Sequence, residues 1–234
     1  MFPTRFFVVP CAWLAMLAVP AFGLTVQNPS FEGPAITYDP TPGAFNALPW
    51  ADGWLLTNAA GSSNNVGVFY NSPAGNPDHI TNPDLNQLAF LGSETGNGLS
   101  QTLGLVYQTG HTYQFTVAVC GSYYRPLAAN STLELVLGYL DNTSTFVDIP
   151  SATHIISSAS VGDTALTDFS VTLPAVQSTA PWAGRTIDLA LRAVGPAGGY
   201  WDLDKVRVVE TPEPATLALL SPLALLLVRR RASR

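Results

Sequence analysis

Apolar and polar residues alternate along most of the chain between positions 24 and 210, with the period of two that is typical of β-strands. The clearest alternation occurs in three segments, HTYQFTVAV (111–119), TLELVLGYL (132–140) and RTIDLALRAV (185–194). A fourth segment, LTDFSVTLP (166–174), alternates with a break in phase near Asp168. Further candidate strands are VGVFY (66–70), NQLAFLG (86–92), GLSQTLG (98–104) and YWDLDKVRVV (200–209).

Residues typical of turns, mainly Asn, Gly, Pro and Ser, separate these segments. Seven prolines between positions 33 and 84 predict long surface loops there. About nine or ten short strands with this spacing favour an all-β fold made of two antiparallel sheets. The expected fold is therefore a two-sheet antiparallel jelly-roll sandwich.

The last candidate strand contains a phase change. Trp201 and Leu203 share one face, whereas Val206 and Val208 share the other. Because side chains alternate strictly in a regular strand, both pairs can point inward only if one extra residue is inserted. The pattern predicts a β-bulge near Asp204 and Lys205.

The two ends of the chain differ from the middle. Residues 1–23 contain one cation, an apolar stretch and the small residues Ala21 and Gly23, which is the layout of a signal peptide. An uncleaved N-terminal anchor is the alternative, which Pro10 and Pro20 disfavour. We therefore expect a β-sandwich domain over 24–210 and a separate C-terminal segment over 211–234.

Charge is distributed unevenly between these parts. All sixteen Asp and Glu residues, but only five of the ten Lys and Arg residues, lie between positions 24 and 214, so this stretch has a net charge of −11. Such an acidic surface disfavours nucleic acid as a partner. Cys120 is the only cysteine outside the signal peptide, so no internal disulfide is expected, and its apolar surroundings predict a buried, inert thiol.

Three segments resemble carbohydrate-binding modules of the family 4, 9 and 22 type. They are VQNPSFE with the following DGW, LSQTLGLVYQTGHTYQFTVAV, and the closing YWDLDKVRVV, in which Lys205 stands where the family often has a second acid. The resemblance implies a galactose-binding-like jelly roll with a structural Ca²⁺ between its first and last strands. The implied ligands are Glu32 and Asp204, with Asp202 nearby; the alternative is that these acids cap turns or are solvated.

The C-terminal segment resembles the PEP-CTERM sorting signal. Pro212, Glu213 and Pro214 precede an apolar run over 215–228, and Arg229, Arg230 and Arg231 follow it. Fourteen helical residues span about 21 Å, less than a hydrocarbon core of about 30 Å. The segment therefore predicts a short transmembrane helix that holds the protein briefly in the inner membrane. The resemblance implies an exosortase-type processing enzyme as partner, and export to the cell surface or extracellular matrix of a Gram-negative-type bacterium.

No catalytic motif stands out. The three histidines lack metal-ligand spacing, no G-x-S-x-G is present, and no carboxylate pair is distinguished from the rest. Four aromatic residues in predicted loops are candidate platforms for sugar rings, namely Trp50, Tyr123, Tyr124 and Trp182, whereas Trp54 and Trp201 are expected in the core.

The expected function is therefore a non-catalytic, carbohydrate-binding-like protein associated with extracellular polysaccharide. Two alternatives remain open at this point. One is a structural biofilm or matrix protein without sugar binding, and the other is a polysaccharide-active enzyme.

Overall fold

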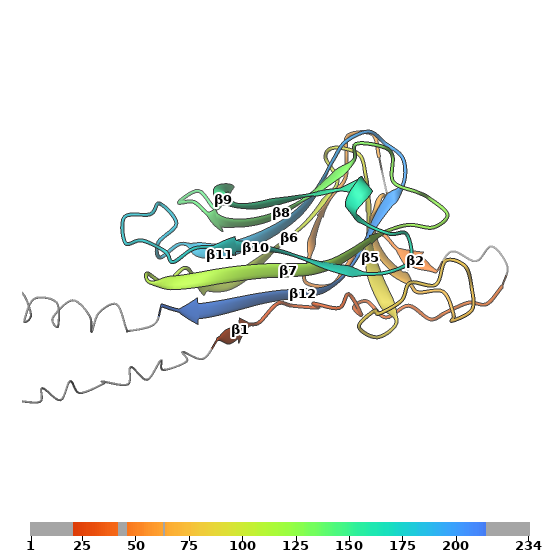
Figure 1. Cartoon of the computed structure of the whole chain (residues 1–234), viewed down its shortest axis with the longest axis horizontal. Helices are drawn as coiled ribbons and strands as arrows, with labels where there is room; N and C mark the ends of the chain where they lie inside the picture. Colours follow the sequence, from red (N-terminus) through yellow and green to blue (C-terminus); the bar gives the residue numbers. More distant parts are fainter. Residues whose placement is uncertain (1–20, 42–45, 63, 214–234) are drawn as a thin grey trace, which may run out of the picture. The chain divides into compact units, whose positions relative to one another are not determined.

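Twelve strands and one short 3₁₀ turn (η1, Ser158–Ser160) form two antiparallel sheets in the computed structural model, which describes residues 21–41, 46–62 and 64–213 (Figure 1). The first sheet has the order β10-β7-β12-β5-β4-β2, and β1 also pairs with β12. The second sheet has the order β3-β6-β11-β8-β9. The expected all-β sandwich is confirmed.

The strand bounds agree with the alternating segments of the sequence. The first sheet contains β1 (Phe22–Leu24), β2 (Ala47–Leu48), β4 (Val66–Tyr70), β5 (Gln87–Gly92), β7 (His111–Gly121), β10 (Thr167–Leu173) and β12 (Tyr200–Pro212). The second sheet contains β3 (Leu55–Thr57), β6 (Gly98–Val106), β8 (Thr132–Leu140), β9 (Phe146–Ser157) and β11 (Thr186–Val194).

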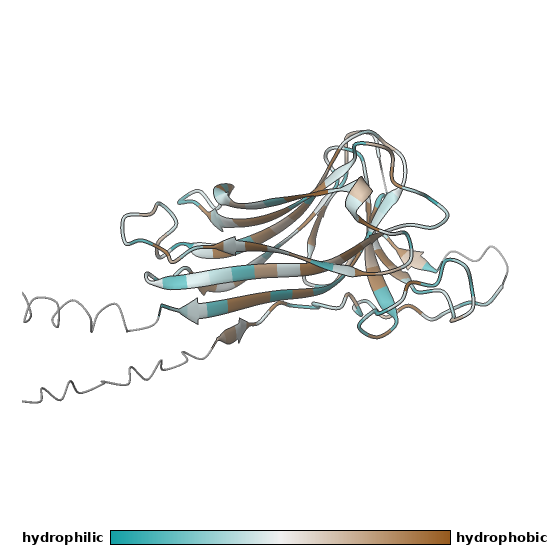
Figure 2. Ribbon diagram, viewed as in Figure 1, coloured by the Kyte–Doolittle hydropathy of each residue, from teal (hydrophilic) through white to brown (hydrophobic). Residues whose placement is uncertain are grey.

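The main core lies between the two sheets. Every second residue of the central strands points into it, and Figure 2 shows this alternation as bands along β7 and β12. Trp54 and Trp201 are both buried in this core, as the sequence predicts. Burial of apolar surface between the sheets is the main favourable contribution to such a fold.

Strand β9 has no counterpart among the predicted strands. Its sequence contains Pro150, which cannot donate a backbone hydrogen bond and is normally confined to sheet edges and bulges. The structure satisfies this restriction, because β9 is the edge strand and its register with β8 shifts in the segment between Asp148 and Thr153.

The predicted bulge in β12 is confirmed. Asp204 pairs with Ala118 and Arg207 pairs with Thr116, so two residues of β12 lie opposite one residue of β7. Lys205 has a φ of 54°, in the left-handed region. The extra residue allows the apolar side chains before and after it to face the same core.

A second, smaller apolar cluster lies on the outer face of the first sheet. Ile80, Leu88 and Cys120 are buried there, and Phe69 and Leu166 pack against them. The connections over 71–86 and 158–166 meet above this face, where the amide N–H of Thr81 donates to the carbonyl oxygen of Thr164 at 2.8 Å. The break in phase near Asp168 is therefore real, since Leu166 packs outside the sheet whereas Phe169 packs inward.

Residues 21–212 form one compact unit, and the chain enters it directly through β1 at Phe22. Most of the predicted signal peptide, and the apolar run and arginines of the predicted sorting signal, lie outside the described residues. Within the part of the chain that the structure describes, no helix has the length and apolar character needed to cross a membrane.

The left-handed backbone at Lys205 gives the first testable prediction. A β-branched side chain is strained in this conformation, whereas glycine is not, and the left-handed region costs an L-residue about 1–2 kcal/mol. We expect Lys205→Val to lower the free energy of unfolding in urea by about that amount relative to Lys205→Gly. Equal stability of the two variants would argue against the bulge.

Candidate functional site

The outer face of the first sheet carries an acid at the point where three strands meet. Asp202 of β12 pairs with Phe90 of β5 on one side and with Cys120 of β7 on the other. Paired residues of neighbouring strands point to the same face, so these three side chains lie in one row. The row is opposite to the core, because the neighbours of Asp202 in sequence, Trp201 and Leu203, point inward.

The side chain of Asp202 is buried, and its environment sets it apart from the other acids of β12. The residue is only 4% exposed, and its side chain makes no hydrogen bond or ion pair with any residue that the structure describes. Burial alone raises the pKa of this carboxyl well above its usual range. The group is therefore held in its neutral, proton-carrying form at pH values where an exposed Asp is ionised. Burial also raises the pKa of the Cys120 thiol, which confirms the expected buried, inert cysteine.

Aromatic rings lie beside this acid. The Phe90 ring makes edge contacts with Tyr200 at 5.7 Å and with Phe69 at 6.3 Å between centroids. Tyr200 and Phe69 are half-buried, so part of the ring cluster is open to solvent. The backbone N–H of Tyr200 donates to the carbonyl of Arg125 at 3.1 Å, which ties the 122–131 connection to the start of β12.

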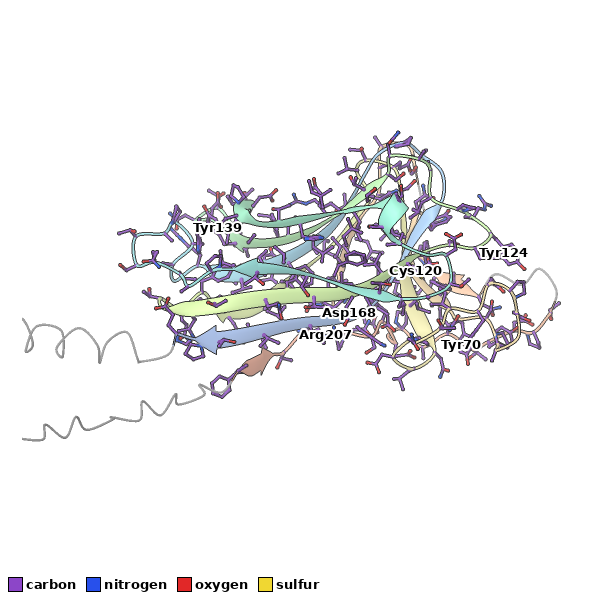
Figure 3. All side chains as sticks on the ribbon, viewed as in Figure 1. Tyr70, Cys120, Tyr124, Tyr139, Asp168 and Arg207 are labelled. Atoms are coloured by element: carbon purple, nitrogen blue, oxygen red, sulfur yellow. The ribbon has the colours of Figure 1, made fainter. Side chains whose placement is uncertain are left out.

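Two of the predicted sugar-contacting residues belong to that connection. Tyr123 and Tyr124 are 46% and 67% exposed, and their rings make an edge contact at 5.1 Å. In Figure 3, Tyr124 and Tyr70 lie at the same end of the sandwich as Cys120. Trp50 is also exposed, at 48%. Trp182 departs from the expectation of an exposed platform, since its ring packs half-buried against the main core.

The three predicted calcium ligands do not converge. Asp202 faces the apolar row described above. Glu32 accepts hydrogen bonds from the backbone N–H groups of Asn86 and Gln87 at 2.7 and 2.6 Å, and Asp204 accepts one from Asp84 at 2.5 Å. No group of three His, Cys, Asp or Glu side chains suited to a metal ion occurs among the described residues. Calcium stays a prediction, and only Glu32 and Asp204 meet at one segment, 84–87.

The fold and this site define a β-sandwich protein with a buried acid among aromatic rings on one sheet face. The model of the HpiC1-like family, described as HpiC1 cyclase, matches residues 23–209, and the chain belongs to this family. A search of curated proteins found no match.

Solved structures with the same fold include two cyclases. Fisc, a Stig cyclase from Fischerella sp. TAU, was solved in complex with (3Z)-3-(1-methyl-2-pyrrolidinylidene)-3H-indole. Its sequence is 20% identical to this chain, and the structures match with a TM-score of 0.63. The match covers 83% of this chain and 100% of that one. A cyclase from Fischerella sp. TAU with 4-(1H-indol-3-yl)butan-2-one is 21% identical, with a TM-score of 0.61 and coverage of 82% and 98%.

A carbohydrate-binding module is also similar, at a lower level. The CBM22-1 xylan-binding domain from Paenibacillus barcinonensis is 15% identical, with a TM-score of 0.43 and coverage of 68% of this chain and 86% of that one. At this score the likeness carries no argument about function.

These findings correct the expected function. A non-catalytic carbohydrate-binding protein, or a structural protein of the biofilm matrix, is wrong, because the family that matches the domain is a cyclase family. For the same reason, the expected class of PEP-CTERM matrix proteins is wrong, and the HpiC1-like family takes its place. Of the tail residues that suggested it, Pro212 ends β12 and Glu213 follows, whereas Pro214 and Arg229–Arg231 lie outside the described residues. Export and processing at the membrane stay predictions.

Sequence reasoning named Asp202 but assigned it to a metal. The signal that could have separated it from Asp204 is its position between Trp201 and Leu203 in a strand with apolar neighbours on both faces. Asp204 by contrast has hydrogen-bond donors, because the amide groups of Asp84 and Lys205 lie within 2.5 and 2.7 Å of its carboxylate.

The pH dependence of stability tests the burial of Asp204. Burial raises the pKa of Asp204 to about 7. The folded state therefore binds this proton more tightly than the unfolded state, and stability falls as pH rises from about 4 to about 7. We expect the free energy of unfolding of the wild type, measured in urea, to fall by up to about 4 kcal/mol relative to Asp204→Asn over this range. Parallel curves for the two proteins would contradict the raised pKa.

Proposed function

We propose that this protein is a cyclase that uses Asp202 as its proton donor. The observation that carries the proposal is a buried carboxyl that has no hydrogen-bond or ionic partner in the described part of the chain, in a member of the HpiC1-like family. A buried carboxyl without partners destabilises a fold, and such groups are concentrated at functional sites.

The reaction needs one acid that also acts as a base. The neutral carboxyl of Asp202 donates its proton to an alkene carbon of the substrate, and a cation forms on the neighbouring carbon. The electron pair of a nucleophilic ring carbon then forms the new carbon–carbon bond. The carboxylate takes a proton back from the resulting ring cation. The product is an isomer of the substrate, so neither an oxidant nor a reductant is consumed.

The ring cluster suits the charge that this reaction creates. The negative face of an aromatic ring attracts a cation, and the attraction is stronger where water is excluded. Phe90 lies opposite the acid in the sheet, Tyr200 lies two residues before it on the same strand, and Phe69 extends the ring cluster beyond Phe90. The surroundings therefore favour a short-lived carbocation while leaving Asp202 as the proton carrier.

The class of substrate follows from the ring surface and from the two solved cyclases, both of which hold an indole-derived molecule. We propose an indole that carries an alkenyl chain, with its ring against the aromatic cluster and its alkene at Asp202. Tyr123 and Tyr124, on the connection that binds the start of β12, would contact the outer part of such a substrate.

Replacing the carboxyl tests the acid directly. Asp202→Asn keeps the size of the side chain but removes the proton that is donated. We expect turnover of a panel of 3-alkenylindoles, followed as isomer formation by liquid chromatography and mass spectrometry, to fall by about 10²–10⁴-fold. In D₂O the wild-type product should gain one deuterium from solvent at the protonated carbon.

The matched control is Asp168→Asn on the same sheet face. Asp168 is exposed and pairs with Arg207 at 2.6 Å, and Figure 3 shows the two residues side by side. An exposed ion pair contributes little to stability, so the variant should fold like the wild type. Its turnover should stay within about twofold of the wild-type value. Full activity of Asp202→Asn, or a product without solvent deuterium, would exclude Asp202 as the donor. No turnover of any alkenylindole by the wild type would exclude the substrate class.

A further inference from the structure

The second sheet carries a groove that the proposed reaction does not use. Its volume is about 610 Å³, within the range of pockets that hold small molecules. Strands β3, β6 and β11 line it, together with the ends of β8 and β9. It lies on the outer face of the second sheet, so the whole core separates it from Asp202.

An acid forms part of the groove floor. Asp188 of β11 is 5% exposed and pairs with Thr102 of β6 and with Gly138 of β8. Its carboxylate accepts a hydrogen bond from the N–H of Leu189 at 3.0 Å, and burial raises its pKa. No Lys, Arg or His forms an ion pair with it in the described part of the chain.

One wall of the groove is aromatic. A Cβ atom at Gly138 would collide with the Phe146 ring, so this glycine allows the ring to lie directly on β8. The guanidinium of Arg192 lies over the same ring, 4.7 Å from its centroid. Leu140 and the 69% exposed Leu55 add apolar surface at the rim.

The charges around the groove are unbalanced. Among the described residues that line the groove the single cation is Arg192, and Asp148 holds it through two hydrogen bonds of 2.8 and 2.7 Å. Glu134 pairs with Arg192 across the strands and lies on the same face. The charge of Arg192 is balanced by that of Asp148. The charges of Asp188 and Glu134 are then in excess, beside an apolar wall. A cation attached to an apolar ring is complementary to this arrangement.

We propose that this groove is a second binding site, for a small protonated amine carried on an aromatic ring. The ammonium group binds the Asp188 carboxylate, and the ring lies against Phe146, Leu140 and Leu55. The proposal does not depend on the function assigned to Asp202.

The test uses the full-length protein and two probes of equal size. Phenethylammonium carries the charge, and 2-phenylethanol has a hydroxyl in its place. We expect phenethylammonium, titrated to about 10 mM, to shift the backbone amide NMR signals of Thr102, Gly138 and Ala190 in a saturable manner. The alcohol should bind about tenfold more weakly, since it cannot form a charge-assisted hydrogen bond.

Two variants distinguish a loss of binding in the groove from a loss of folding. Asp188→Asn should weaken phenethylammonium binding about tenfold. Leu55→Lys places a like charge on the exposed rim and should also weaken binding without a cost in folding, whereas Asp168→Asn on the other sheet should not change it. Absence of saturable shifts in the groove, equal binding of amine and alcohol, or unchanged binding by both groove variants would overturn the proposal.

Discussion

One inserted residue in β12 determines which side chains of this strand face the core and which lie on the outer face of the first sheet. Because β12 lies between β5 and β7, it supplies side chains to the core on one face and to the aromatic row on the other. Without the bulge at Lys205, either Trp201 and Leu203 or Val206 and Val208 would leave the core, at a cost of several kcal/mol for two large apolar side chains. The bulge keeps both pairs inward and leaves Asp202 and Asp204 on the outer face.

The positions of the two acids along the same strand show how environment decides chemistry. Asp204 lies at the bulge, where turned backbone N–H groups stabilise its carboxylate. Asp202 lies two residues earlier in regular strand, where the neighbouring N–H groups are occupied by the sheet. Both groups have a raised pKa, but among the residues that the structure describes only Asp202 lacks a hydrogen-bond donor. The proposed proton transfer uses the carboxyl whose neutral form is favoured in this way.

The alternating pattern was sufficient to predict the sandwich, most strands and the bulge, because burial on one face imposes a period of two. The site was harder to predict, since the residues that carry the resemblance to sugar-binding modules maintain the fold. Asn28 bonds both backbone groups of Gly33, the carbonyl of Asn28 accepts from the Trp54 indole at 3.2 Å, and Gln101 bonds the backbone of Gln27. These contacts hold the first loop to the sandwich, whatever ligand the protein binds. The motifs therefore indicate the fold and say nothing about the ligand.

The irregular edge strand β9 also affects how copies of the protein meet. An exposed edge normally offers a row of free N–H and C=O groups to a neighbouring sheet, and Ile155 adds an apolar side chain that is 61% exposed. Pro150 has no N–H to offer a neighbouring strand, and the register of β9 with β8 shifts around it, so the edge is irregular at this point. The residue that makes this strand difficult to recognise in the sequence also protects the sandwich against edge-to-edge aggregation.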